Sequence, residues 1–132
     1  MAASVYPIPF TDTTLLIDFG RPLRTVSLGH FLDKVEIQVI KEIARYGGKS
    51  RIPSGGFDRN MDGFAFSVYS PSELPSQRHV TREILKDVVD GVGGIVVGDR
   101  RFNEVFFVIQ TGLDDIFRGY GHFVAQRQGA DS

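Results

Sequence analysis

The residues that come nearest to a recognisable chemical site lie between Asp58 and Gly63. Asp58, Asn60 and Asp62 stand at alternate positions and Gly63 follows them, which matches the opening half of a calcium-binding loop. Such a loop supplies oxygen ligands at alternate positions and needs a glycine for its sharp turn. The twelfth position, however, is Tyr69 and not the glutamate that would bind with two oxygens. Because Asp and Asn are also common turn residues, we predict a hairpin turn here, with no metal or other cofactor.

The other residue types that carry chemistry are scattered or absent. The chain has no cysteine, which excludes disulfides, thiol nucleophiles and thiolate metal sites. His30, His79 and His122 lie far apart in the sequence, without the spacing of metal ligands. No serine, histidine and acidic residue can be assigned from the sequence as a catalytic set. We therefore favour a protein that is not an enzyme. The alternative is a small isomerase or cyclase with a pocket between sheet and helices.

Composition limits the class of protein further. A chain of 132 residues with 42% hydrophobic residues and 11 phenylalanines is long enough and apolar enough to form one globular domain. The formal net charge of -1 provides no overall field for nucleic acid or anionic lipid. No apolar run approaches the roughly 18 residues that span a bilayer. We expect no nucleic acid and no membrane as partners, and the sequence does not distinguish a cytoplasmic from a secreted protein.

The first half of the chain predicts a strand, a helix and a hairpin. Alternating apolar residues in 14–19 predict a half-buried strand. Apolar residues at helical spacing from Leu28 to Ile43 then predict an amphipathic helix, with Ser27 as its N-cap. A weak strand at 51–60 leads into Asp62 and Gly63, the residue pair that a two-residue type I′ hairpin turn prefers. The returning strand, 64–69, directs its phenylalanines to one face.

The second half predicts another helix and another hairpin. Ser76 is a candidate N-cap, and an apolar stripe continues from Val80 to Val96. Glycines within this stripe allow a helix that ends at Gly91, but we prefer a helix that reaches Val97 because the stripe keeps its phase. Residues 105–110 predict a central strand, followed by a last strand. The predicted core includes residues from both helices and three strands: Val35, Val39, Phe66, Val88 and Val108.

These elements predict an α+β fold of two layers. The order strand, helix, hairpin, helix, hairpin places two helices on one face of an antiparallel sheet, and it is the order of a ferredoxin-like fold. We assign this domain to residues 14–125. Residues 1–13 are predicted to form an N-terminal arm and residues 126–132 a polar tail.

The segment 63–69 resembles the aromatic signature of RNA-recognition motifs. That signature alternates aromatic and small residues after a basic residue and a glycine, and its exposed rings stack on RNA bases. Here Asp62 replaces the basic residue, Ser67 replaces an aliphatic one, and Leu16 occupies the aromatic position of the companion strand. RNA binding is therefore kept as a third alternative. The other interpretation is a hairpin strand that buries its two phenylalanines.

Four sequence segments, taken together and in their order along the chain, resemble small uncharacterised proteins of filamentous fungi that are often described as effector-like. They occupy residues 15–23, 52–57, 63–70 and 117–122, so that the resemblance covers 14–125. The second helix of those proteins often opens with Thr-Trp, whereas this chain has no tryptophan. The resemblance supports the α+β fold and transfers no functional residues. The absence of a catalytic set and a possible weak sheet edge favour a protein-interaction module of effector type.

The last strand, 116–125, provides the candidate binding residues. We predict it to lie at a sheet edge because Gly119 and Gly121 interrupt it and a polar tail follows. An edge leaves backbone groups unpaired, which favours strand addition by a protein partner or by a second copy in a homodimer. The side chains offered for this contact are Arg118, Tyr120, His122 and Phe123.

Overall fold

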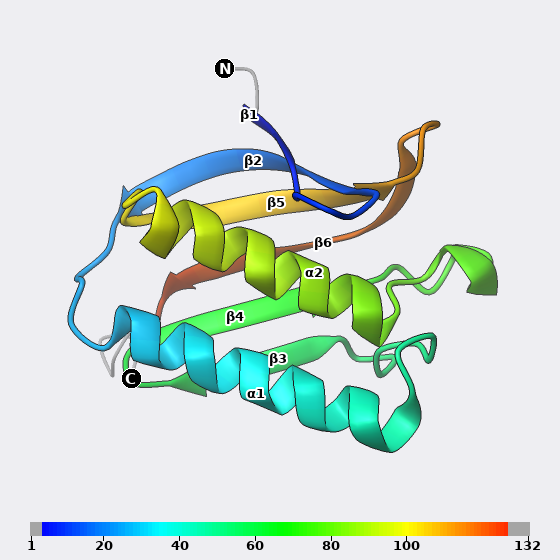
Figure 1. Ribbon diagram of the computed structural model, residues 1–132, viewed down its shortest axis with the longest axis horizontal. Coiled ribbons are helices and arrows are strands. Elements are labelled where there is room, and N and C mark those ends of the chain that lie inside the picture. The colour runs from blue at the N-terminus through cyan, green and yellow to red at the C-terminus, as the bar shows by residue number, and fades with distance from the viewer. Residues whose placement is uncertain (1–3, 127–132) are drawn as a thin grey trace.

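The computed structural model describes residues 4–126 as a six-stranded antiparallel sheet with two helices packed on one face (Figure 1). The strands are β1 (Ser4–Pro7), β2 (Thr13–Pro22), β3 (Phe57–Met61), β4 (Phe64–Tyr69), β5 (Asn103–Thr111) and β6 (Ile116–Ala125). The helices are α1 (Leu28–Tyr46) and α2 (Arg82–Gly93), with short helical turns at η1 (Ser76–Arg78) and η2 (Gly94–Gly98). The predicted α+β fold with both helices on one face of the sheet is confirmed.

The strand order is β1-β2-β5-β6-β4-β3, and this order corrects two expectations. First, β6 is an interior strand that pairs with β5 on one side and β4 on the other, so the predicted edge position is wrong. Second, the ferredoxin-like order is not confirmed, because the sheet has six strands in this order, which is more strands than the prediction contained. The sixth strand is β1, which comes from the segment predicted as an arm and pairs with β2. Residues 1–3 and 127–132 lie outside the described part of the chain, including nearly all of the predicted tail.

Helix α1 follows its predicted pattern. Its buried residues recur at spacings of three and four, from Leu28 to Val39, and turn one stripe towards the sheet. Ser27 precedes the first turn as predicted, but it has a positive φ of 65° and its side chain makes no cap hydrogen bond. The helix ends at Gly47, where a φ of 90° suits a glycine and the backbone N–H donates to the Ile43 carbonyl.

The β3–β4 hairpin also confirms its turn. Asp62 and Gly63 have φ values of 55° and 85°, the positive pair that a type I′ turn requires. Strand β3 begins only at Phe57, because residues before it form turns. Arg51, where the strand was expected to start, makes one isolated bridge to Thr81.

Helix α2 begins later than predicted. Ser76 starts the short turn η1, and the cap of α2 is Thr81, whose hydroxyl accepts a hydrogen bond from the Ile84 N–H at 3.3 Å. At the other end the helix continues into the π-helical turn η2, which confirms the longer of the two predicted helices. Gly91 is needed inside it, because an added Cβ would lie 2.8 Å from the Ile8 side chain.

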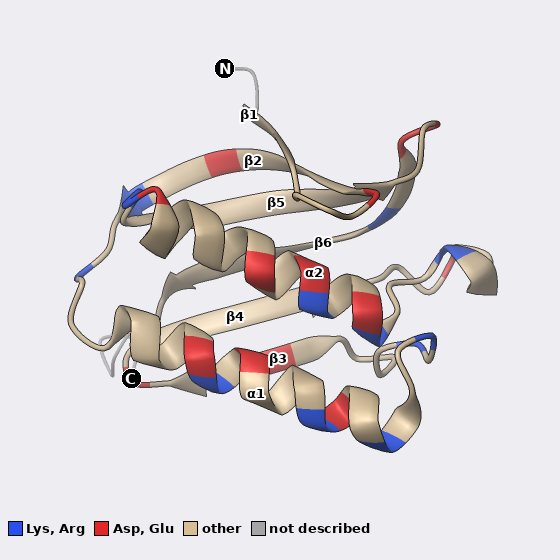
Figure 2. Cartoon of the chain, in the orientation of Figure 1, with Lys and Arg blue, Asp and Glu red and all other residues tan. Residues whose placement is uncertain are grey.

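The core fills the space between the sheet and the two helices. Phe31 of α1 stacks on Phe123 of β6, with ring centroids 5.6 Å apart, and Phe64 lies at the same distance from each of them. Phe64 and Phe66 are 2% and 0% exposed, so the rings of the RNA-recognition-like signature face the core. Of the five predicted core residues, only Val108 is misplaced, because its side chain faces away from the helices. Figure 2 places most charged residues on the helices and loops.

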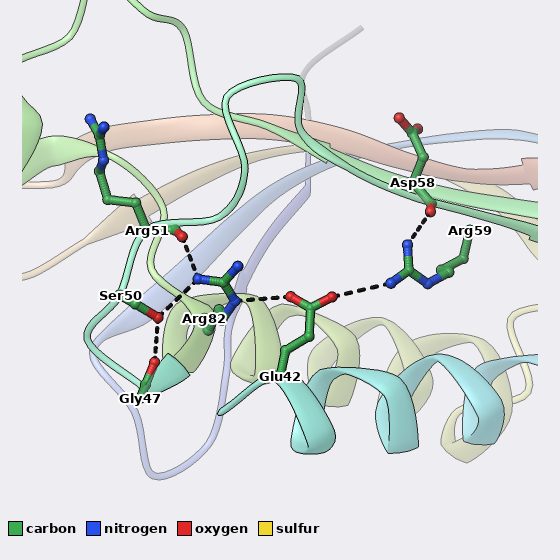
Figure 3. Close-up of polar contacts among 7 residues, drawn as sticks. All are labelled: Glu42, Gly47, Ser50, Arg51, Asp58, Arg59 and Arg82. Carbon is green, nitrogen blue, oxygen red and sulfur yellow. Dashed lines mark hydrogen bonds and ion pairs between the residues drawn. The ribbon is translucent and has the colours of Figure 1, made fainter. Parts of the chain in front are cut away.

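One buried charge network ties the helices to the sheet (Figure 3). The Arg82 side chain, only 7% exposed, donates from Nε to Glu42 at 2.9 Å and from a terminal nitrogen to the Arg51 carbonyl at 2.6 Å. The other oxygen of Glu42 accepts from Arg59 of β3 at 3.1 Å. Arg82 also donates to the Ser50 hydroxyl at 2.9 Å. Two helices, a loop and a strand therefore meet at one ion-paired cluster.

Candidate functional site

Within residues 4–126, both helices lie on the same side of the sheet, and its other face has no helix packed on it (Figure 1). We call the face turned away from α1 and α2 the open face. In a strand, alternate residues point to opposite faces, so half of each strand contributes to it. The interior strands place large apolar side chains there, among them Phe106 and Tyr120, which are 43% and 47% exposed. Phe117 and Val5 are exposed as well, at 37% and 64%. Apolar side chains that are gathered on one surface are typical of an interaction site.

The strand register arranges these side chains in two adjacent rows across the sheet. The tyrosine row runs from β1 to β4 and contains Val5, Leu16, Val108, Tyr120 and Tyr69. The histidine row runs from β2 to β3 and contains Asp18, Phe106, His122, Ser67 and Asp58. The histidine row therefore has an acidic residue at each end, Asp18 on β2 and Asp58 on β3.

The aromatic rings of the two rows contact one another. The ring centroids of Tyr69 and Tyr120 lie 5.8 Å apart. His122 bridges the rows, because its ring lies 6.4 Å from Tyr69 and 6.2 Å from Phe106. These separations fall in the range where aromatic pairs attract. The result is a cluster of four rings, in contact and partly exposed, at the middle of the open face.

Asp58 fixes one side of this cluster. Its carboxylate accepts hydrogen bonds from the Ser67 hydroxyl and, at 2.9 Å, from the Tyr69 hydroxyl. The hydrogen bond with Ser67 lowers the pKa of Tyr69, but burial and the Asp58 carboxylate together raise it above its ordinary value. Tyr69 is therefore a neutral hydrogen-bond donor at physiological pH, and its hydroxyl is held against the Asp58 side chain.

Basic residues of the strands lie away from the two rows. Arg59 of β3 pairs with Glu42 on the helix side of the sheet, and Arg118 of β6 donates to Thr111 and to the Gln77 carbonyl near η1. Arg21 lies at the end of β2, with its Nε 4.0 Å from Glu104. Within residues 4–126, the two rows hold two carboxylates and neither lysine nor arginine.

The structure brings together only half of the predicted binding residues. Tyr120 and His122 lie at the centre of the open face. Phe123 points to the opposite side and is fully buried in the core. Arg118 leaves the pattern because β6 is bulged opposite Ile109 and Gln110, which adds one residue to the strand.

The calcium-like residues do not share a site. The Asp58 carboxylate accepts hydrogen bonds from Ser67 and Tyr69. The Asp62 carboxylate instead forms an ion pair with Lys34 of α1, with Nζ and Oδ2 3.3 Å apart. Asn60 follows Asp58 on the open side of β3, without a common ligand position. In the described part of the chain, no three His, Cys, Asp or Glu side chains are grouped so that they could hold a metal ion.

Sequence reasoning missed the other members of the open face. Asp18 alternates with apolar neighbours within the predicted strand 14–19, whereas Phe106 lies in a continuous apolar run that does not show which face each residue takes. The sequence did not show that β2 pairs with β5 and that β5 pairs with β6. These two pairings place Asp18, Phe106 and His122 side by side. The signal for each strand was local, whereas the site depends on strand order.

The two edges of the described sheet are poor templates for strand addition. Strand β1 has four residues and ends at Pro7, which has no backbone N–H to donate. Strand β3 has five residues and carries the charged Asp58 and Arg59. Short strands, proline and charge are the usual means by which proteins protect sheet edges.

A second surface feature is a groove of about 310 Å³ between α1 and α2. Its apolar floor includes Leu32 and Val89, and Glu36 and Asp90 lie on its rim. The hydrogen bond with Asp90, together with burial and the Asp90 charge, raises the pKa of Glu36 to about 7. The Lys86 ammonium forms ion pairs with both carboxylates, with its Nζ 3.7 Å from Glu36 Oε2 and 2.9 Å from Asp90 Oδ2.

This carboxylate pair predicts a pH-dependent stability. The pKa of Glu36 is higher in the folded protein than its ordinary value of 4.5, so the folded state binds its proton more tightly than the unfolded state. The free energy of unfolding should therefore fall as the pH rises from about 4.5 through about 7. Glu36→Gln, which cannot ionise, should flatten this dependence and raise the midpoint of urea unfolding at pH 8 relative to the native protein. Equal slopes in both proteins between pH 5 and 8 would contradict the assignment.

None of the helices in residues 4–126 is both long and apolar enough to cross a membrane. The packing of the described chain leaves Val5, Phe106 and Tyr120 of the open face exposed. No model of a protein family, no curated protein and no solved structure matches this chain.

Proposed function

We propose that this protein is a non-enzymatic protein-interaction module of effector-like type, and that it binds its partner through the open face. The proposal rests on the cluster of four rings at the centre of the open face, whose members contact one another and are partly exposed to solvent. The rings belong to Tyr69, Phe106, Tyr120 and His122. Partly exposed aromatic side chains are enriched where one protein binds another.

The proposal places the contact on the face of the sheet and not along an edge. Strand β6 is interior, so its backbone groups are already paired with β4 and β5. The free edges are short, and Pro7 and the charged residues of β3 disfavour an added strand. By contrast, a partner that covers the open face would remove exposed apolar surface from water at Val5, Phe106 and Tyr120.

Two alternatives have less support. For RNA binding, exposed rings would be suitable, but the signature residues Phe64 and Phe66 are in the core, and Asp18 and Asp58 would repel phosphates. For an isomerase or cyclase, the expected pocket would lie between sheet and helices. Most of that region is occupied by fully buried side chains such as Phe31 and Phe123. The pocket of about 210 Å³ at its end, between β1, β2 and η2, has only Asp99 and Arg101 as charged lining residues within residues 4–126.

The test replaces Phe106 by the photo-crosslinking residue p-benzoylphenylalanine. On illumination in an extract of the native organism, this variant should form adducts of discrete mass with another protein. The matched control carries the same residue at Ile40 of α1, which is exposed to a similar degree, 46% against 43% for Phe106. We expect a clearly higher yield of adducts from position 106, because only there would the probe lie within the contact.

The proposal fails if positions 106 and 40 give the same adducts in the same yield, because the open face would then be no more than an ordinary surface. Adducts at position 106 that contain RNA and no second protein would also overturn it, in favour of the RNA-binding alternative.

A further inference from the structure

Resting on the proposed function, we infer that the open face selects a basic partner: a protein segment with an apolar centre flanked by lysine or arginine. The two carboxylates of the histidine row, Asp18 and Asp58, lie at its opposite ends, on β2 and β3. Between them stand Phe106, His122 and Ser67. A complementary surface has apolar side chains in the middle and positive charge on both sides.

The spacing of the carboxylates sets the size of this segment. Asp18 and Asp58 are separated by four strand-to-strand steps, through β5, β6 and β4. At about 4.8 Å per step the two residues lie roughly 19 Å apart. An extended segment rises about 3.3 Å per residue, so roughly six residues separate the two positions that face the carboxylates.

The rings beside Asp58 also suit a cation. Arginine and lysine are attracted to the faces of tyrosine and phenylalanine, and most strongly where the cation meets a carboxylate as well. Asp58 holds the Tyr69 hydroxyl at 2.9 Å, and the Tyr69 ring lies against Tyr120. A guanidinium group stacked on Tyr120 would thus lie close to a carboxylate whose position is already fixed.

The same charges argue against two other occupants. A second copy of this chain, placed face to face, would bring further Asp18 and Asp58 carboxylates to a surface whose rows hold no lysine or arginine in residues 4–126. Like charges at an interface disfavour association. Nucleic acid would bring phosphates to the same carboxylates.

The experiment measures fluorescence anisotropy with two short labelled peptides that share a five-residue Leu-Tyr-Val-Tyr-Leu centre. One peptide has an arginine on each side, about six residues apart, and the other has glutamate at these positions. We expect the native protein to bind the arginine peptide at least about tenfold more tightly, and to lose part of this preference when the salt concentration rises. Equal affinity for the two peptides would overturn the inference.

Variants connect this preference to the carboxylates. The double variant Asp18→Asn with Asp58→Asn should bind both peptides equally within about twofold, because asparagine keeps an acceptor oxygen for Ser67 and Tyr69 but carries no charge. The control, Asp114→Asn with Asp115→Asn in an exposed turn, changes the net charge equally and should keep the preference. If both double variants lose the preference alike, net charge alone explains it and the inference fails.

The outcome is separable from that of the proposed function. If p-benzoylphenylalanine at position 106 gives undiminished protein adducts when Asp18 and Asp58 are also replaced, the open face binds a partner but does not select it by charge. If position 106 gives no protein adducts, the proposed function itself is wrong. Tighter binding of a labelled uridine oligonucleotide than of the arginine peptide, or concentration-dependent dimers that a Phe106→Ser variant abolishes, would replace the basic segment by another occupant.

Discussion

Replacing Arg82 by leucine is expected to lower the free energy of unfolding by about 3–5 kcal/mol, the usual cost of breaking a buried ion pair. Arg82 is 7% exposed, and its guanidinium group is held by Glu42, Ser50 and the Arg51 carbonyl. Its loss removes one partner from each of these groups at the junction of α1, α2 and β3, and the Glu42 carboxylate keeps only Arg59. Urea unfolding at constant pH measures the change.

Two further variants test the cause. Arg24→Leu removes the same type of side chain from an exposed position, and it should change the free energy of unfolding by less than about 0.5 kcal/mol. Adding Glu42→Leu to Arg82→Leu removes the unpaired charge, so the double variant should recover part of the lost stability. A double variant whose loss equals the sum of the two single losses would contradict a direct interaction between Glu42 and Arg82.

Gly121→Ala is the second change for which we expect a large loss, of about 3 kcal/mol or more. An added Cβ at Gly121 would lie 2.1 Å from the Ser67 carbonyl oxygen and 2.8 Å from the Phe107 ring. The oxygen belongs to the backbone of β4, so relief of the clash requires the β4–β6 pairing to shift and not just one side chain to rotate. The ring of Phe107, 3% exposed, has little room to move.

The matched control is Gly93→Ala in α2. Apart from the backbone of its own helix, no heavy atom of residues 4–126 lies within 4 Å of a Cβ added there. Alanine is favoured over glycine in a helix by about 1 kcal/mol, so this variant should be more stable than the native protein. Thermal unfolding of both variants gives the comparison. A Gly121→Ala protein that melts at the native temperature would show that β4 and β6 are not packed as described.

Elements whose signal is local could be predicted from the sequence. The apolar stripe gave α1, and the type I′ turn followed from Asp62 and Gly63, because only certain residues tolerate two positive φ values in succession. The first residue of α2 was harder to predict from the sequence. Ser76 and Thr81 are both good N-caps, and the choice between them depends on the chain before α2. There the Arg82 N–H donates to the Ser50 carbonyl, a long-range contact.

Strand order was the part that the sequence did not reveal. Gly119 and Gly121 suggested a loosened edge strand, whereas they are the residues that let β6 lie close beside β4: an added Cβ at either would lie 2.2 Å or less from a backbone oxygen of that strand. The same glycine pattern therefore has opposite meanings at an edge and in the interior, and only the neighbouring strand decides between them.

The candidate site was predictable only in part, for a related reason. Tyr120 and His122 are two positions apart and must share a face, while Phe123 must take the other, so the pairing of these two was within reach of the sequence. Arg118 shares their parity, but the bulge opposite Gln110 removes it from their face. Asp18 joins them from a strand near the opposite end of the chain.

The pairing of β2 with β5 has a consequence for how the protein is made. Leu15 of β2 lies beside Ile109 of β5, so the centre of the sheet joins segments from near the two ends of the sequence. Contacts between such distant segments slow folding, because a long loop must close before they are gained. During synthesis on the ribosome, β2 is translated before β5, so its apolar face lacks this interior neighbour until β5 has been made. In that interval the apolar residues of β2 are accessible to chaperones that bind nascent chains.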